Sequence, residues 1–155
     1  MTHRVISSLS WARPCDRPKS IPRARAGKGT KGLGIRFERS VSTVLGPKAK
    51  HGQWFEFWDR NGRGFCQPDI IFLSGGNVYI VEVKLTNIEK AQAQLTELYI
   101  PVVSKALESP ARGIIVTKYV TRVTDATLIA NTLTEAIART QLVIPVLHYI
   151  GIGPI

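Results

Sequence analysis

Three charged side chains, Asp69, Glu82 and Lys84, lie in a stretch of the chain that predicts two neighbouring strands. Apolar residues run along 64–73 and again along 77–86, and Ser74-Gly75-Gly76-Asn77 between them is typical of a hairpin turn. In a two-residue turn at Gly75-Gly76, Leu73 faces Val78 and Asp69 faces Glu82. A four-residue loop over 74–77 gives the same register, whereas a three- or five-residue loop shifts it.

The alternation of side chains along each strand brings these three residues together. Glu82 and Lys84 share one face of their strand with Ile80, and Asp69 lines the same face of its neighbour. Like charges directly opposed on a half-buried sheet destabilise it. A divalent cation relieves that repulsion, and oxygen ligands with room for water suit Mg²⁺, or Mn²⁺ in its place, better than zinc.

The cluster allows two interpretations. In a catalytic site, Lys84 holds an attacking water or stabilises charge on a scissile phosphate. In a structural site, the three residues form only a salt-bridge cluster at the end of a sheet. The spacing alone is a weak signal, but the neighbouring elements and the charge of the chain favour the catalytic interpretation.

The elements that position this hairpin come before and after it. A helix is predicted over residues 34–45, where Glu38 borders the apolar stripe, and Gly46-Pro47 ends it. Strands are predicted over 53–58, 64–73 and 77–86, followed by a long helix that Pro101 kinks or breaks. A strand over 113–120, a helix from Thr124 and an edge strand over 142–150 complete the chain. We therefore expect an α/β fold: one domain over 34–155, with a mixed central β-sheet, flanking helices, an αβββαβ core and an additional C-terminal helix and strand.

Charge predicts a polyanionic partner. The chain carries 21 Lys or Arg and 11 Asp or Glu, a net charge of +10, and residues 1–31 hold eight of the basic residues with one Asp. Residues 1–33, rich in Pro and Gly, are predicted to form a basic, flexible N-terminal arm. Nucleic acid is the commonest partner of such an arm, although a tail that only confers solubility has the same composition.

Other features narrow the function class. Two cysteines are too few for a disulfide framework or a zinc site, so a cytoplasmic setting is expected. No run of about 18 apolar residues predicts a membrane span, and no secretory signal is evident. The glycines and lysines of 27–32 lack the spacing of a phosphate-binding loop, so no nucleotide cofactor is expected.

The aromatic strand, His51 and Cys66 each have a possible functional role and a more ordinary structural one. The aromatic residues of the strand 53–58 can stack on bases, but the core is the commoner place for them; they are Trp54, Phe55, Phe57 and Trp58. His51 has the chemistry of a general base, although a surface turn is the more ordinary interpretation. Cys66 is expected to be a small buried apolar residue.

The motif Pro68-Asp69 followed by Glu82-Val83-Lys84 resembles that of the PD-(D/E)XK nuclease superfamily. A helix bearing Glu38 before the hairpin is similar to the family's first motif, and the resemblance covers roughly residues 31–120. It implies that Asp69 and Glu82 ligate Mg²⁺ with the backbone carbonyl of Val83, and that Lys84 positions the water. It also implies that Glu38 orients a ligand water or holds a second metal.

Some branches of the superfamily carry a glutamine on the next helix, and Gln94 comes closest to that position, with Gln92 as an alternative. The expected tyrosine four residues later is Leu98, with Tyr99 one step late. The basic residues expected to contact DNA are Lys28, Lys31, Arg36 and Arg39.

The expected function is a Mg²⁺-dependent DNA endonuclease acting on branched or structured DNA, as in recombination, repair or phage DNA processing. The resemblance implies that cleavage leaves a 5′-phosphate and a 3′-hydroxyl. Four alternatives stay open: an exonuclease, a restriction-type nuclease, an RNA-directed protein, and a DNA-binding or assembly protein that keeps the fold without turnover. A homodimer is compatible with so small a domain.

Overall fold

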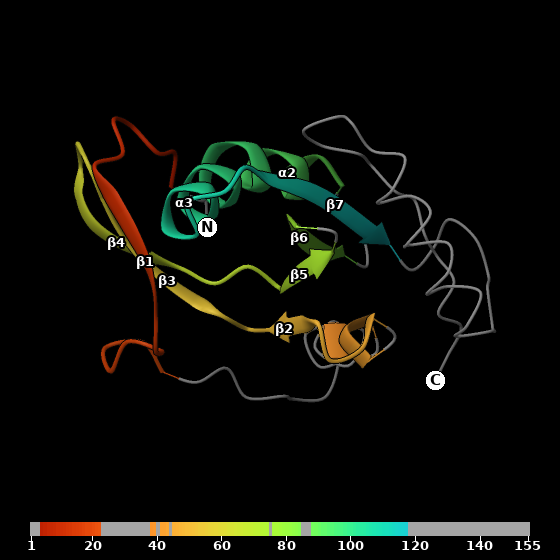
Figure 1. Ribbon diagram of the computed structural model, residues 1–155. Coiled ribbons are helices and arrows are strands. Elements are labelled where there is room, and N and C mark those ends of the chain that lie inside the picture. Colours follow the sequence, from red (N-terminus) through yellow and green to blue (C-terminus); the bar gives the residue numbers. More distant parts are fainter. Residues whose placement is uncertain are drawn as a thin grey trace.

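The computed structural model of the chain contains two β-sheets and a helical segment between them (Figure 1). It describes residues 4–22, 38–39, 41–43, 45–74, 76–84 and 88–117. Its strands are β1 (Trp11–Cys15), β2 (Ala49–His51), β3 (Trp54–Asp59), β4 (Gly62–Cys66), β5 (Ile70–Ser74), β6 (Asn77–Lys84) and β7 (Ala111–Thr117). Its helices are α2 (Ile88–Gln94), the π-helical turn η1 (Leu95–Tyr99) and α3 (Ile100–Ala106). Residues 38–39, 41–43 and 45 are also helical, which agrees with the later part of the predicted helix 34–45.

The larger sheet has the order β2-β5-β6-β7 and carries the predicted hairpin. Its register is the predicted one, because Leu73 pairs with Val78 and Ser74 with Asn77. Gly76 in the turn has a φ of 77°, a conformation that glycine adopts without steric cost. β6 and β7 run parallel, whereas the other neighbours are antiparallel, so this sheet is mixed, as the sequence predicts.

The two faces of the larger sheet are covered by different elements. Ile71, Val78 and Ile80 pack under the helical segment 88–106. Ile70, Tyr79 and Val81 face the other way, where Val41 of the preceding helix is fully buried. The strict alternation of these strands therefore builds one core on each face.

Pro101 marks an irregularity in the helical segment, as predicted. A proline at this position donates no hydrogen bond to the carbonyl of Glu97, and the preceding turn widens to a π-helix that ends with Ile100 N–H bonded to Leu95 O. The carbonyl of Glu97 instead accepts a hydrogen bond of 2.9 Å from the backbone of Ile6. The interrupted helix is thus tied to the N-terminal segment.

The smaller sheet has the order β1-β3-β4 and was only partly predicted. Its inner face carries Phe55 and Phe57, which are 1% exposed and belong to the core under α3. Gly64 on β4 leaves room for the Phe57 ring, because a Cβ at that position would overlap it. The turn at Asn61-Gly62 joins β3 to β4.

The prediction of one strand over 64–73 is wrong, because β4 and β5 belong to different sheets. Gln67, Pro68 and Asp69 separate them. Proline cannot donate to a strand ladder, so a break at this position follows from its chemistry. The break leaves Asp69 just before β5 instead of within it.

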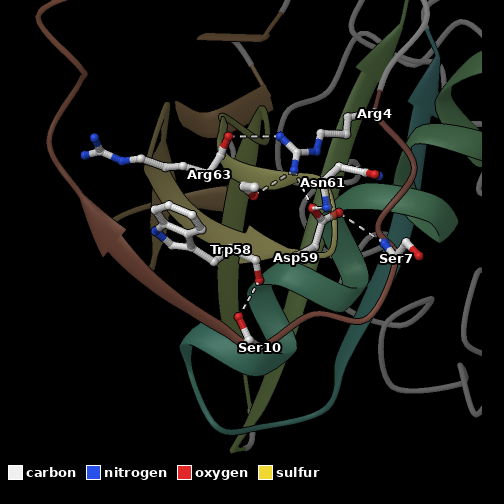
Figure 2. A network of polar contacts seen from close by, with 8 residues as sticks. Arg4, Ser7, Ser10, Trp58, Asp59, Asn61 and Arg63 are labelled. Carbon is white, nitrogen blue, oxygen red and sulfur yellow. Dashed lines mark hydrogen bonds and ion pairs between the residues drawn. The ribbon is translucent and has the colours of Figure 1, made fainter.

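The prediction that residues 1–33 form a flexible arm is wrong for the described part of that segment. β1 pairs with β3 along its whole length, and Ile6 and Leu9 pack against the core. Arg4 bonds to Asp59 and to the carbonyls of Gly62 and Arg63, at 2.8 and 3.0 Å (Figure 2). These side-chain partners lie far along the chain, which is why local composition did not reveal them.

Some of the predicted segments lie outside the residues that the structure describes. The helix from Thr124 and the edge strand 142–150 lie outside them, and so do residues 23–37 of the proposed arm and first helix. β2 was not predicted, because it has only three residues and no apolar alternation. Within the described part of the chain, no helix is both long and apolar enough to cross a membrane.

Candidate active site

The centre of the candidate site is a reciprocal pair of hydrogen bonds between Asp69 and the end of β6. The backbone N–H of Asp69 donates to Oε1 of Glu82 over 3.1 Å, and the N–H of Val83 donates to Oδ2 of Asp69 over 2.8 Å. Each carboxylate is therefore held by a backbone group of the other strand. The geometry confirms that Asp69 lies opposite Glu82, although the regular pairing of β5 begins one residue later, at Ile70.

Lys84 is the cation that forms an ion pair with this cluster among the residues that the structure describes. Its Nζ lies 3.7 Å from Oε2 of Glu82, and its side chain is 28% exposed while that of Glu82 is 1% exposed. Lys84 is thus partly open to solvent, whereas Glu82 is buried. The alternation along β6 puts both residues on one face, as the sequence predicts.

Glu38 and His51 extend the cluster. Glu38 is hydrogen-bonded to the Asp69 side chain, and its Oε2 lies 3.2 Å from Nε2 of His51. Glu38 comes from the first helix and His51 from β2, which pairs with β5. The structure therefore brings four predicted residues together and adds a histidine.

Burial shapes the protonation of all three acids. It raises the pKa of Asp69 to about 7, and the negative charge of Glu38 adds to this effect. Burial and the charge of Asp69 raise the pKa of Glu82 well above its ordinary value, while Lys84 opposes the rise. Burial also raises the pKa of Glu38. Burial therefore disfavours the negative charge on all three carboxyl groups, and a bound cation would favour it.

Gln94 lies behind the cluster and does not enter it through a hydrogen bond to a carboxylate. Its Nε2 donates to the hydroxyl of Tyr99 over 2.8 Å, and its buried Oε1 has no hydrogen-bond partner among the described residues. Burial, together with the charges of Glu82 and Asp69, raises the pKa of Tyr99. The tyrosine one step late in the motif is therefore the partner of Gln94.

The remaining predicted residues fall into two groups. Lys28, Lys31 and Arg36 lie outside the described residues, whereas Arg39 is exposed and close enough to Glu38 to lower its pKa. Cys66 is buried and free, as predicted. His51 was judged a turn residue because β2 was not recognised, and the sequence holds no other signal that would have placed it beside Glu38.

The donor set was compared with what a metal ion requires. Within the described residues, no three or more His, Cys, Asp or Glu side chains form a group that would hold a metal by themselves. Mg²⁺ differs from zinc in this respect, since it is commonly held by one or two carboxylates and keeps several waters. Two buried carboxylates of raised pKa beside an open lysine fit Mg²⁺ or Mn²⁺ and do not fit a structural zinc site.

Comparisons with known proteins leave the family open. No protein-family model matches the chain, and no curated protein matches it either. Among solved structures, protein VC1899 from Vibrio cholerae is similar, with 13% sequence identity and a TM-score of 0.40. The match covers 71% of this chain and 28% of that one, so the chain spans less than a third of the protein that it matches.

Proposed function

We propose that this protein is a Mg²⁺-dependent DNA endonuclease that hydrolyses phosphodiester bonds. The observation that carries the proposal is the pairing of Asp69 and Glu82 through each other's backbone, with Lys84 3.7 Å from Glu82. A merely structural cluster has no need for two carboxylates whose burial disfavours their charge. A site for a cation and a phosphate gives that arrangement a use.

Each residue of the cluster has a distinct proposed role. Asp69 and Glu82 hold Mg²⁺ together with the backbone carbonyl of Val83. The ion, when bound, supplies Lewis acidity toward the phosphate and lowers the pKa of water. Lys84 positions the attacking water and stabilises negative charge on the phosphate. Because its side chain is partly exposed, Lys84 reaches a bound strand without rearrangement.

Glu38 and His51 act as positioning residues in this proposal. Glu38 contacts both Asp69 and His51, so it orients the Asp69 carboxyl and a water beside it. Gln94 and Tyr99 support the cluster from the helical segment. Their shared hydrogen bond orients the Tyr99 hydroxyl, while burial and the charges of Glu82 and Asp69 raise the pKa of that hydroxyl.

The substrate class follows from charge. A net charge of +10 favours a nucleic acid, and a small domain has little room for reading a long sequence, so branched or structured DNA is proposed. Action in the cytoplasm on DNA undergoing recombination, repair or phage processing, with a homodimer as the acting form, belongs to the same proposal. A substrate panel distinguishes this endonuclease activity from an exonuclease or a restriction-type activity.

A substrate panel with matched variants tests the function. Purified protein is incubated with a four-way junction, a flap, a linear duplex, a single strand and a supercoiled plasmid, each with Mg²⁺, Mn²⁺ or EDTA. We expect cutting with metal only, leaving 5′-phosphate ends, and loss of cutting in Asp69→Asn. Binding without cutting under every metal would instead establish the alternative, a DNA-binding or assembly protein in which the carboxylates have a structural role.

A further inference from the structure

The outer face of the smaller sheet gathers all three tryptophans of the chain. Trp11 pairs directly with Trp58 across β1 and β3, and Cys15 pairs with Trp54 in the same register. Because side chains alternate, these tryptophans point away from the core that Phe55 and Phe57 occupy. Trp11 is 37% exposed and Trp58 is 41% exposed, which is unusual for the largest apolar side chain. The aromatic stretch of the sequence thus divides into a core half and a surface half.

Arginines lie among these rings on the same face. The guanidinium of Arg13 lies 5.5 Å from the ring centre of Trp11, and that of Arg63 lies 4.9 Å from the ring centre of Phe65. Arg63 is also the register partner of Trp58. Figure 2 shows the Trp58 indole and the Arg63 side chain on the side of the strands opposite to Asp59, which turns toward Arg4 and Ser7.

Glu56 holds the two arginines in place. Its Oε2 accepts a hydrogen bond of 2.8 Å from Arg13, and its Oε1 accepts one of 2.5 Å from Arg63. Glu56 is 4% exposed, whereas the side chains of Arg13 and Arg63 are 65% and 54% exposed. One buried acid therefore fixes two exposed cations, and the face keeps a net positive charge, to which the exposed Arg60 in the adjoining turn adds.

We infer that this face, defined by Trp11, Trp58, Phe65, Arg13 and Arg63, binds an unpaired DNA strand. Bases stack on exposed aromatic rings of a sheet whatever their sequence, and arginines beside the rings contact the phosphates. A duplex hides the flat faces of its bases, so it lacks the surface that the tryptophans would contact. The inference deepens the proposed function by naming the form of DNA that is recognised, and it rests on that function only in assuming that the same DNA reaches the acid cluster.

Charge decides between a strand and a second copy of the chain as the occupant. Two copies meeting through this face would bring Arg13, Arg60 and Arg63 of each against the same residues of the other, and the two Glu56 carboxylates are already paired. A polyanion with aromatic bases complements both the charge and the rings. A homodimer through this face is therefore disfavoured and becomes an outcome of the test.

Tryptophan fluorescence measures this binding directly, because every tryptophan of the chain lies on the proposed face. The full-length protein is titrated with fluorescein-labelled and unlabelled oligo(dT) of 12 nucleotides in EDTA, so that cleavage plays no part in the result. We expect strong quenching of the tryptophans that saturates together with the fluorescence anisotropy of the label. A duplex of equal length should quench far less. Saturating anisotropy without quenching would place the strand elsewhere and overturn the inference.

Matched variants separate stacking from folding. Trp11→Ala and Trp58→Ala should each weaken oligo(dT) binding about ten-fold, whereas Trp58→Phe, which keeps a ring, should weaken it only slightly. Leu73→Ala removes a side chain of similar exposure from the other sheet and should leave binding unchanged. Equal affinity of wild type and both alanine variants would contradict the inference. So would tighter binding of oligo(U), or a concentration-dependent dimer whose formation alone changes the fluorescence.

The experiment distinguishes this inference from the proposed function. A protein that binds oligo(dT) through the tryptophans but never cuts DNA would keep the inference and refute the nuclease. A protein that cuts DNA while its tryptophans stay unquenched by single strands would keep the nuclease and refute the inference.

Discussion

Asp69 and Glu82 are individually unfavourable for folding, and that cost is the main physical feature of the candidate site. Both are held by backbone N–H groups, yet burial raises the pKa of each above its ordinary value. When the pKa of a group is higher in the folded state than in the unfolded state, the folded protein loses stability as the pH rises from the unfolded pKa through the folded pKa. The two acids therefore weaken the metal-free protein at neutral and alkaline pH.

Glu82→Gln should raise the melting temperature of the metal-free protein at pH 8. The amide keeps the acceptor for Asp69 N–H but removes the buried charge, and a gain of about 1–2 kcal/mol corresponds to about 3–6 °C for a chain of this size. The difference should shrink as the pH falls toward 4.5, because the folded wild-type group is then protonated and the unfolded group begins to be. Thermal unfolding in EDTA from pH 5 to 8.5 measures it, and a variant that is less stable at every pH would show that the charge is well compensated.

The hairpin is the element that the sequence predicted best, and the reason is local. Turn residues, alternation and register are all encoded within about 16 consecutive residues, so Asp69, Glu82 and Lys84 were placed correctly relative to one another. β1, β2 and His51 were missed because their partners lie far along the chain. Pairing such as that of Trp11 with Trp58 leaves no mark in the short-range pattern.

One buried acid, Asp59, holds the N-terminal segment against the smaller sheet. Asp59 accepts hydrogen bonds from Arg4, from Ser7 N–H over 3.1 Å and from Asn61 N–H over 2.8 Å. Burial alone would raise the pKa of Asp59, but these bonds outweigh it and lower the pKa. The stability they provide is complete above the ordinary pKa of an aspartate and is lost as the pH falls through the lowered value.

Asp59→Ala should therefore destabilise the protein by about 2–4 kcal/mol at pH 7, since it removes the carboxylate that accepts hydrogen bonds from Arg4 and two backbone N–H groups. The deficit should narrow below about pH 4, because Asp59 begins to take up a proton there in the unfolded state and is protonated in the folded state only at a lower pH. Urea unfolding at both pH values measures this, with the exposed Asp16→Ala as control. A constant deficit across the pH range would show that side-chain packing, and not the charge, carries the effect.

At the scale of the whole molecule, the proposed cleavage and the proposed DNA binding take place in two different regions. The acid cluster lies at the end of the larger sheet, and the aromatic and basic face lies on the outside of the smaller one, joined to it through the core under α3. The excess of Lys and Arg supplies attraction for DNA that does not depend on sequence. Composition alone predicts the class of partner that we propose, whereas the proposed binding face could be inferred only from the pairing of the strands.

Replacing Lys28 and Lys31 by Gln should weaken duplex binding and make it less sensitive to salt. Each lost phosphate contact reduces the slope of log affinity against log salt by about 0.9. Anisotropy titrations at salt concentrations from about 50 to about 300 mM measure the change. This interval includes the range of about 50–200 mM over which DNA affinity falls steeply. An unaltered slope would assign the attraction to other basic residues.

The most direct test of the central claim compares the DNA-cleavage rate of the wild type with those of Glu82→Gln and Glu108→Gln in Mg²⁺. The two variants make the same chemical change, one in the cluster and one in the exposed turn after α3. The account predicts metal-dependent cleavage by the wild type and Glu108→Gln, and a loss of at least about a hundred-fold in Glu82→Gln. Equal cleavage by all three proteins, or cleavage that persists in EDTA, would contradict the assignment of Asp69, Glu82 and Lys84 as the active site.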